Sequence, residues 1–187
     1  MPDRAEMEAF WQRWLDTNKA CEAKRDWSDL AEFFAVDATY GWNCGPDDEF
    51  MAVGRDQIRE LALGLEMQGL EGWTYPYQAT LIDDRAGMIV GFWKQVSDAK
   101  RTDGTSYVVA GLGASWFGYA GGAWAWQRDF FDHLNAGALF FEMMSAGVLS
   151  DGMRSRIEMA SSGQLLPGHF RRADIPAPLW PNEAGYF

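Results

Sequence analysis

Four runs with the two-residue alternation of β-strands follow one another from residue 73 onwards. They cover residues 73–82, 88–97, 106–119 and 121–135. Turn signals separate them: Asp83-Asp84 with Gly87, a polar loop at 98–104, and Ala120-Gly121-Gly122. Short connections join antiparallel neighbours, so the pattern predicts an antiparallel sheet.

Helical periodicity flanks this sheet on both sides. Apolar residues at Phe10, Trp11, Trp14 and Leu15 predict a helix over residues 3–24. Shorter helices are expected at 27–34 and 57–67, the second capped by Asp56. Two further helices are expected at 136–146 and 153–160, before a Pro-rich tail at 167–187. Helices grouped around a curled antiparallel sheet indicate an α+β fold.

The chain has 187 residues, enough for one domain with a substantial core. We place that domain at residues 1–135 and expect residues 136–187 to form a helical extension packed on the same domain or on a partner subunit. The formal net charge of −11 argues against nucleic acid and against an anionic membrane as partners. No apolar run approaches the roughly 20 residues of a membrane span.

The remaining bulk features concern compartment and cofactors. The N-terminus lacks the apolar region of a signal peptide, and Cys21 and Cys44 form no Cys-x-x-Cys pair. We therefore expect a cytoplasmic protein. His133 and His169 lie far apart, and no metal-ligand spacing or phosphate-binding glycine loop occurs. We expect neither a metal nor a cofactor.

Aromatic residues make up 15% of the chain, and 10 of them are Trp. Two interpretations fit this excess. The rings can simply fill the core, or they can line a wide cavity suited to aromatic or polycyclic ligands.

The order of several short motifs resembles a known family. LAEFFAVDATYGW, GRDQIRELALGL, a hairpin, the GG turn and QRDFFD together resemble the nuclear transport factor 2-like (NTF2-like) superfamily, and its SnoaL-like branch most. The resemblance covers residues 5–135. It implies a cone, in which a curved mixed or antiparallel sheet wraps around N-terminal helices and a deep pocket opens at the wide end. Family members include ketosteroid isomerases, scytalone dehydratase, limonene epoxide hydrolase, polyketide cyclases and proteins without catalysis, so the fold does not choose the function.

The polar groups of the ketosteroid isomerases do not carry over to this chain. Their oxyanion-hole Tyr and Asp fall on Trp14 and Gly113, and their Asp base falls on Trp42 or Asn43. The resemblance therefore excludes the isomerase mechanism of that branch. The His pair of scytalone dehydratase does not transfer either.

The Asp–Arg–Asp relay of limonene epoxide hydrolase carries over only in part. One relay Asp falls on Asp129 and a strand Tyr on Tyr40, whereas the Arg and the second Asp fall on Trp93 and Gln95. One carboxylate of the relay survives. Epoxide hydrolysis would need a rebuilt water site.

Strand alternation groups the candidate site residues. If Asp129 faces the pocket, so do Gln127, Ala125 and Ala123. The same logic turns Trp93, Gly91 and Gln95 inward on one strand, and Gly111, Gly113 and Ser115 on another. We expect these small residues to leave volume for a ligand. The expected substrate-binding residues are Trp14, Trp42, Asn43, Trp93, Gln127 and Tyr75.

Asp129 is the central catalytic candidate. A carboxylate among rings loses hydration, which raises its pKa and suits it to general acid or base catalysis. Tyr40 could donate to a developing oxyanion, and Gln95 could orient a ligand. His133 could pair with Asp129 as a proton shuttle. The alternatives are structural: a partner of Arg128 for Asp129, core packing for Tyr40 and a solvent-facing loop position for His133.

Trp116, Trp124 and Trp126 are expected on the outer face of the sheet. Exposed rings there would form a costly apolar patch. We expect a homodimer that buries them, with coverage by the C-terminal tail as the competing expectation.

These observations predict a cofactor-independent acid/base enzyme, a lyase, dehydratase or isomerase, acting on an aromatic or polycyclic molecule. Ring-processing lyases among the resembling proteins suggest a lignin-derived diaryl as substrate. The alternatives are a non-catalytic protein that binds hydrophobic ligands, and an epoxide hydrolase with a rebuilt water site.

Overall fold

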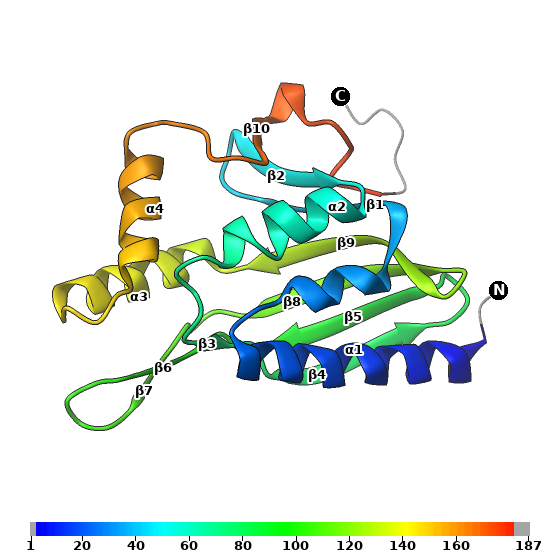
Figure 1. Ribbon diagram of the computed structural model, residues 1–187, viewed down its shortest axis with the longest axis horizontal. Coiled ribbons are helices and arrows are strands. Elements are labelled where there is room, and N and C mark those ends of the chain that lie inside the picture. The colour runs from blue at the N-terminus through cyan, green and yellow to red at the C-terminus, as the bar shows by residue number, and fades with distance from the viewer. Residues whose placement is uncertain (1–2, 182–187) are drawn as a thin grey trace.

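The computed structural model describes residues 3–181 (Figure 1). The chain begins with α1 (Arg4–Lys24), close to the predicted bounds. The side chain of Asp3 caps α1 by accepting a hydrogen bond from the amide of Ala5, and Arg25 ends the helix in the left-handed conformation. A 3₁₀ turn, η1 (Ser28–Phe33), leads into the sheet.

The described residues form a seven-stranded sheet in the order β10-β2-β1-β9-β8-β5-β4. All neighbouring strands are antiparallel except β1 and β9, which are parallel, so the sheet is mixed. The strands are β1 (Phe34–Asn43), β2 (Asp48–Val53), β4 (Tyr77–Asp83), β5 (Met88–Trp93), β8 (Gly113–Ala120), β9 (Ala123–Phe131) and β10 (His169–Arg171).

Three of the predicted strands are each divided between this sheet and a second, smaller one. The smaller sheet has the order β3-β6-β7, with β3 (Trp73–Thr74), β6 (Val96–Lys100) and β7 (Ser106–Val108). The divisions coincide in space, because the amide of Lys94 bonds the carbonyl of Pro76 and the amide of Val109 bonds the carbonyl of Gln95. The chain therefore turns a corner here, which Pro76 favours because it cannot continue the ladder.

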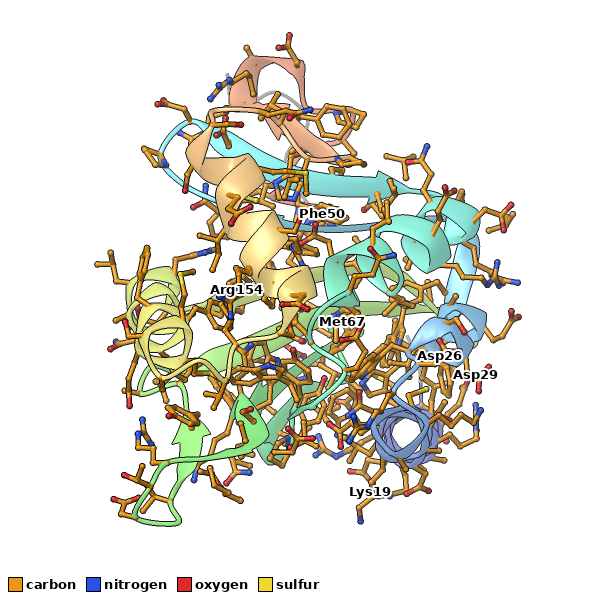
Figure 2. The ribbon with its side chains drawn as sticks, turned by 60° about the vertical axis from the view of Figure 1, so that its left-hand side comes forward. Lys19, Asp26, Asp29, Phe50, Met67 and Arg154 are labelled. Atoms are coloured by element: carbon orange, nitrogen blue, oxygen red, sulfur yellow. The ribbon has the colours of Figure 1, made fainter. Side chains whose placement is uncertain are left out.

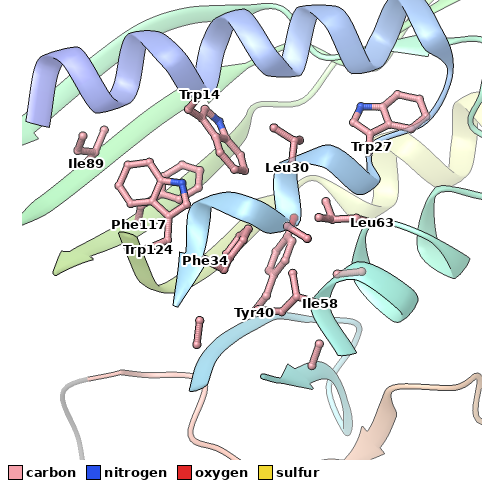
Figure 3. Close-up of a cluster of buried hydrophobic side chains, with 14 of the residues drawn as sticks. Trp14, Trp27, Leu30, Phe34, Tyr40, Ile58, Leu63, Ile89, Phe117 and Trp124 are labelled. Atoms are coloured by element: carbon pink, nitrogen blue, oxygen red, sulfur yellow. The ribbon is translucent and has the colours of Figure 1, made fainter. Parts of the chain in front are cut away.

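Helix α1 lies along one face of the large sheet and supplies the main core (Figure 1). Phe10, Trp11 and Trp14 from α1 meet Phe117 and Trp124 from the sheet edge-to-face, with ring centroids 4.6–6.3 Å apart. Figure 3 shows Trp14 reaching down from α1 toward Phe117 and Trp124. Most of the aromatic excess therefore fills a core beneath α1.

The prediction that Trp124 lies on the outer face is wrong. Gly118 pairs with Trp126 but Tyr119 pairs with Trp124, so Ala125 is an extra residue in β9. This bulge reverses the alternation: Trp126 faces outward against Trp116, whereas Trp124 is 0% exposed in the core. It also removes Ala123 and Ala125 from the face that Gln127 and Asp129 share. The hairpin before it is as predicted, with positive φ at Gly121 and Gly122.

The helix predicted at 57–67 is broken into three pieces. These are α2 (Arg55–Gln57), a π-helical turn η2 (Ile58–Ala62) and a 3₁₀ turn η3 (Leu65–Met67). Gly54, with φ of 87°, occupies the cap position that the sequence assigned to Asp56. Asp56 instead pairs with Arg59, 3.1 Å away.

The C-terminal segment packs beside the small sheet. Helices α3 (His133–Ser145) and α4 (Asp151–Ser161) enclose a second core with Leu70, Trp73 and Tyr107, contributing Leu139, Met143 and Met153. A 3₁₀ turn, η4 (Arg172–Asp174), follows β10. The end of the predicted extension, residues 182–187, lies outside the described residues. No helix within residues 3–181 is long and apolar enough to cross a bilayer.

The tail runs over the outer face of the large sheet. Arg128, buried on that face, donates to the carbonyl oxygens of Pro178 and Leu179 at 2.9 and 2.6 Å. Trp180 packs on Trp116 with centroids 6.2 Å apart. The C-terminal tail therefore covers part of this face, which was the alternative to a dimer interface.

Candidate active site

A pocket of about 210 Å³ opens between the large sheet, α1, η3 and the two C-terminal helices. Its walls are largely aromatic. The rings come from α1 and the segment after it, from β1, from the corner between the sheets, from the end of β9 and from α3: Trp14, Trp27, Tyr40, Trp42, Tyr75, Tyr77, Trp93, Phe131 and Phe140. Polar side chains interrupt this wall at Asn18, Glu66, Gln95, Ser115, Gln127, Asp129 and Arg156.

All the predicted site residues line this pocket except Asn43 and His133. Asn43 follows Trp42 on β1 and therefore points to the other side of the strand. Its carbonyl oxygen lies 2.7 Å from Nε2 of His133. Its side-chain amide donates to the carbonyl of Gly45. His133 thus contacts the rim strand and does not reach Asp129 through any hydrogen bond between described residues.

Tyr75 and Gln95 reach the pocket because of the corner between the sheets. Tyr75 lies between β3 and β4, and Gln95 lies between β5 and β6. Where the ladder is interrupted, both side chains turn into the space that the two sheets enclose. Gln95 is 8% exposed. Burial raises the pKa of Tyr75, and the charge of Arg156 and the Gln95 side chain oppose that rise.

Strand register assembles the polar end of the pocket. β9 lies between β1 and β8, with Asp129 opposite Trp42 on one side and Ser115 on the other. Gln127 is opposite Tyr40. Side chains two residues apart on one strand and directly opposite on its neighbours share a face. Adjacent inward positions therefore converge on the Asp129 carboxylate.

Two side chains donate to the carboxylate of Asp129, one to each oxygen. The Tyr40 hydroxyl donates to Oδ2 at 2.5 Å, and Nε2 of Gln127 donates to Oδ1 at 2.8 Å. Behind them, Nε1 of Trp93 donates to the Ser115 hydroxyl at 2.9 Å. Oε1 of Gln127 is buried and has no partner among the described residues. A carboxylate oxygen accepts two bonds, so Asp129 keeps accepting capacity for a ligand.

Burial raises the pKa of Asp129, and the hydrogen bonds from Gln127 and Tyr40 oppose that rise. Burial and the charge of Asp129 also raise the pKa of Tyr40 well above its ordinary value. Tyr40 therefore remains a hydroxyl donor, while Asp129 is poised to exchange a proton. The pair can take a proton from a bound molecule and return it.

The small inward residues do not leave the ligand space that was expected of them. A Cβ on Gly113 would lie 2.1 Å from the Trp93 ring, and one on Gly91 would lie 2.5 Å from Tyr77. These glycines admit aromatic rings to the wall. A Cβ on Gly111 would meet Asp132 and not a cavity.

Sequence reasoning missed the charged pair Glu66 and Arg156. Arg156 lies three residues after Met153 on α4, and both line the pocket. That i, i+3 spacing places them on one helix face. The sequence does not show that this face lines the pocket, because that depends on where α4 packs. Within residues 3–181, no group of three His, Cys, Asp or Glu side chains could hold a metal ion.

No protein-family model matches the chain, and no curated protein sequence matches it. Solved structures do match its fold. A candidate SnoaL-like polyketide cyclase from Jannaschia sp. CCS1 aligns with a TM-score of 0.55 and 14% identity over 74% of this chain and 96% of that one. An NTF2-like protein from Anabaena variabilis ATCC 29413 aligns with a TM-score of 0.52 and 13% identity over 71% and 94%.

A third structure, TerC co-crystallized with polyporic acid, aligns with a TM-score of 0.50 and 14% identity over 68% of this chain and 95% of that one. These alignments cover nearly all of each solved chain but leave a quarter or more of this chain outside the shared fold. At such low identity the likeness concerns architecture alone. The helices, the curved mixed sheet and the pocket between them show that this chain has the α+β cone fold of NTF2-like and SnoaL-like proteins.

Proposed function

We propose that the chain is a cofactor-independent enzyme that binds an aromatic small molecule in the pocket and moves a proton through Asp129. The observation that carries the proposal is a buried carboxylate set among rings, with a tyrosine hydroxyl at 2.5 Å and a pKa raised by burial. Perturbed carboxylates in apolar clefts are typical of general acid/base sites.

The aromatic wall supports the proposed class of substrate. Rings from α1, from β1 and from α3 line one pocket, as Trp14, Trp42 and Phe140 illustrate. Such walls favour flat, mainly apolar ligands with a few polar groups. We infer a molecule with two rings, such as a lignin-derived diaryl, because aromatic side chains line the pocket on several sides. The co-crystallization of TerC with polyporic acid supports the view that this fold accommodates small organic molecules.

The proposed chemistry uses two polar groups of the pocket wall, Asp129 and Tyr40. Asp129, once ionised, takes a proton from a carbon or hydroxyl group of the substrate, and Tyr40 donates a hydrogen bond to oxygen where negative charge develops. Asp129 then returns the proton at another atom. Lyase, dehydratase and isomerase reactions share this first step, and Gln95 is placed to orient a carbonyl or hydroxyl group of the ligand.

The test uses proton exchange, because it does not require the natural substrate. Aromatic ketones with acidic α-hydrogens, such as 2-tetralone, are incubated with the protein in D₂O, and deuterium incorporation is followed by NMR. We expect the wild type to accelerate exchange. Asp129→Asn should reduce the enzymatic rate by about 100-fold or more, and Tyr40→Phe by a smaller factor.

A matched control and a binding measurement separate catalysis from folding. Asp37→Asn, at an exposed position on β1, should exchange at the wild-type rate. Quenching of the pocket tryptophans should show that Asp129→Asn still binds the ketone. If wild type and Asp129→Asn bind equally and neither accelerates exchange, the protein is a hydrophobic-ligand binder and the catalytic proposal fails.

A further inference from the structure

A second group of reactive side chains lies beside the pocket, where the end of β1, η3 and β10 meet. Cys44 follows β1, Glu66 belongs to η3 and His169 begins β10. Sγ of Cys44 is 3.4 Å from Nδ1 of His169, and Nε2 of His169 is 3.1 Å from Oε1 of Glu66. The three side chains form a continuous series from thiol through imidazole to carboxylate.

The carboxylate end of this series is anchored. Nη2 of Arg156 lies 2.5 Å from Oε2 of Glu66, and Nη1 donates to the carbonyl oxygen of the same residue. The two side chains are 19% and 11% exposed. The His169 ring packs edge-on against Phe50, with centroids 5.5 Å apart. In the view of Figure 2, α4 runs alongside the labelled Phe50 and Met67. The imidazole is therefore held in one orientation.

Electrostatics settles which nitrogen of His169 carries the proton. Burial acts to raise the pKa of Glu66, but the hydrogen bond from His169 and the charge of Arg156 hold it below its ordinary value. An ionised carboxylate only accepts hydrogen bonds. Nε2–H of His169 therefore donates to Glu66, and in the neutral imidazole this leaves Nδ1 as the acceptor that faces the Cys44 thiol. A nucleophile, a base and a group that orients the base make up a catalytic triad.

The thiol needs that base. Burial raises the pKa of Cys44 to about 12, so the resting group is the neutral thiol at physiological pH. Only a base that removes the proton as a bond forms can make it reactive, and Nδ1 of His169 is in place to do so. Cys21 provides a contrast within the same chain, since it is 0% exposed inside α1 and its pKa is raised to about 11, mainly by burial.

The charges around the thiol restrict what it can react with. Besides burial, the pKa of Cys44 is raised by the negative charges of Glu66, Asp48 and Glu49. Asp48 pairs with Arg171 at 2.5 Å, and Glu49 pairs with Arg172 at 3.3 Å. Each of these three negative charges disfavours further negative charge at the thiol, so an anionic reagent is repelled. A neutral electrophile suits the site.

We propose that Cys44 is the nucleophile of a Cys44–His169–Glu66 triad that adds to neutral α,β-unsaturated carbonyl compounds. The Sγ–C bond forms at the β-carbon while the thiol proton passes to Nδ1 of His169. The electron pair of the C=C bond moves onto the carbonyl oxygen as an enolate. The enolate then regains the proton from His169 at its α-carbon, so that no group leaves and no oxidant is consumed.

The probe for this site is N-ethylmaleimide, a neutral acceptor of the proposed class. The folded wild type is treated at several pH values, and the modified peptides are quantified by mass spectrometry. Cys44 should react and Cys21 should not until the protein is unfolded. Between pH 7 and 9 the rate at Cys44 should rise by much less than tenfold per pH unit, because the base and not hydroxide removes the proton. A rate that rises tenfold per pH unit would show an unassisted thiol and overturn the proposal.

Variants test the roles of the base and of the orienting group. His169→Gln should lower the rate at Cys44 by about 100-fold at pH 7, the lower end of general-base contributions. Glu66→Gln should lower it less, because an amide oxygen can still accept from Nε2. Glu60→Gln, at an exposed position on η2, is the matched control and should change nothing. Equal rates in wild type and a folded His169→Gln variant would refute the triad.

Discussion

At the scale of single residues, the ionised form of Asp129 costs stability at its position. Its carboxylate is buried among rings, and burial raises its pKa even though Tyr40 and Gln127 donate to it. Residues that cost stability in this way are characteristic of functional sites. The cost should be measurable as a dependence of stability on pH.

The sign of that dependence follows from proton linkage. Because the folded state holds the Asp129 proton more tightly than the unfolded state, stability falls as pH rises from the ordinary value of 3.8 through the folded pKa. Asp129→Asn removes this loss. In urea denaturation the variant should be more stable than wild type at pH 8, and the gain should shrink as pH approaches 4. A variant that is equally destabilised at both pH values would contradict the direction assigned to this pKa.

At the scale of elements, the sequence determined most of the helices and strands but not the places where a strand changes direction. Helix α1 could be predicted because its apolar spacing is regular, and the hairpin at Gly121-Gly122 because both residues need positive φ. The bulge at Ala125 could not, since one extra alanine leaves no periodic signature. It alone moved Trp124 from the expected outer face into the core.

The same distinction applies to the residues of the candidate site, some of which could be predicted from the sequence and some not. Asp129, Tyr40 and Gln127 could be placed together because regular strands carry them. Arg156 could not be placed, because its position at the pocket depends on where α4 packs. Contacts with residues far away in the sequence set that packing, and the sequence of α4 does not reveal them. His133 was expected near Asp129, but Asp132 caps α3 and that helix start turns the imidazole toward the carbonyl of Asn43.

Close packing between β5 and β8 yields a prediction at this scale. A Cβ on Gly113 would lie 2.1 Å from the Trp93 ring, a pocket wall. Gly113→Ala should therefore destabilise the fold by about 1–3 kcal/mol through overpacking and weaken binding of aromatic probes. The matched control is Gly137→Ala in α3, where nothing lies within 4 Å of the new Cβ. It should stabilise by about 0.5–1 kcal/mol. Thermal unfolding and tryptophan quenching check both, and a neutral Gly113→Ala would mean that Trp93 can move.

At the scale of the whole molecule, the tail and self-association compete for the outer face of the sheet. Pro178 and Leu179 supply acceptors to the buried Arg128, and Trp180 packs on Trp116. Deleting residues 178–187 should cost about 1.5–3 kcal/mol for each of these two hydrogen bonds to the charged guanidinium. It should also expose Trp116 and Trp126.

Exposed rings on a sheet face favour self-association. The truncated chain should therefore sediment as a larger species than the full chain at the same concentration. The control is a chain ending at residue 181, which keeps every tail contact named above. If the chain ending at residue 177 and the chain ending at residue 181 sediment identically, the tail does not shield this face.

The central claim is that the pocket carboxylate is poised to exchange a proton, and its titration tests that claim most directly. Aspartate labelled with ¹³C at the side-chain carboxyl lets each group be followed by NMR as pH changes, and the resonance missing from Asp129→Asn identifies Asp129. Asp129 should titrate above the ordinary 3.8 and above the exposed aspartates. A titration of Asp129 at or below 3.8 would contradict it.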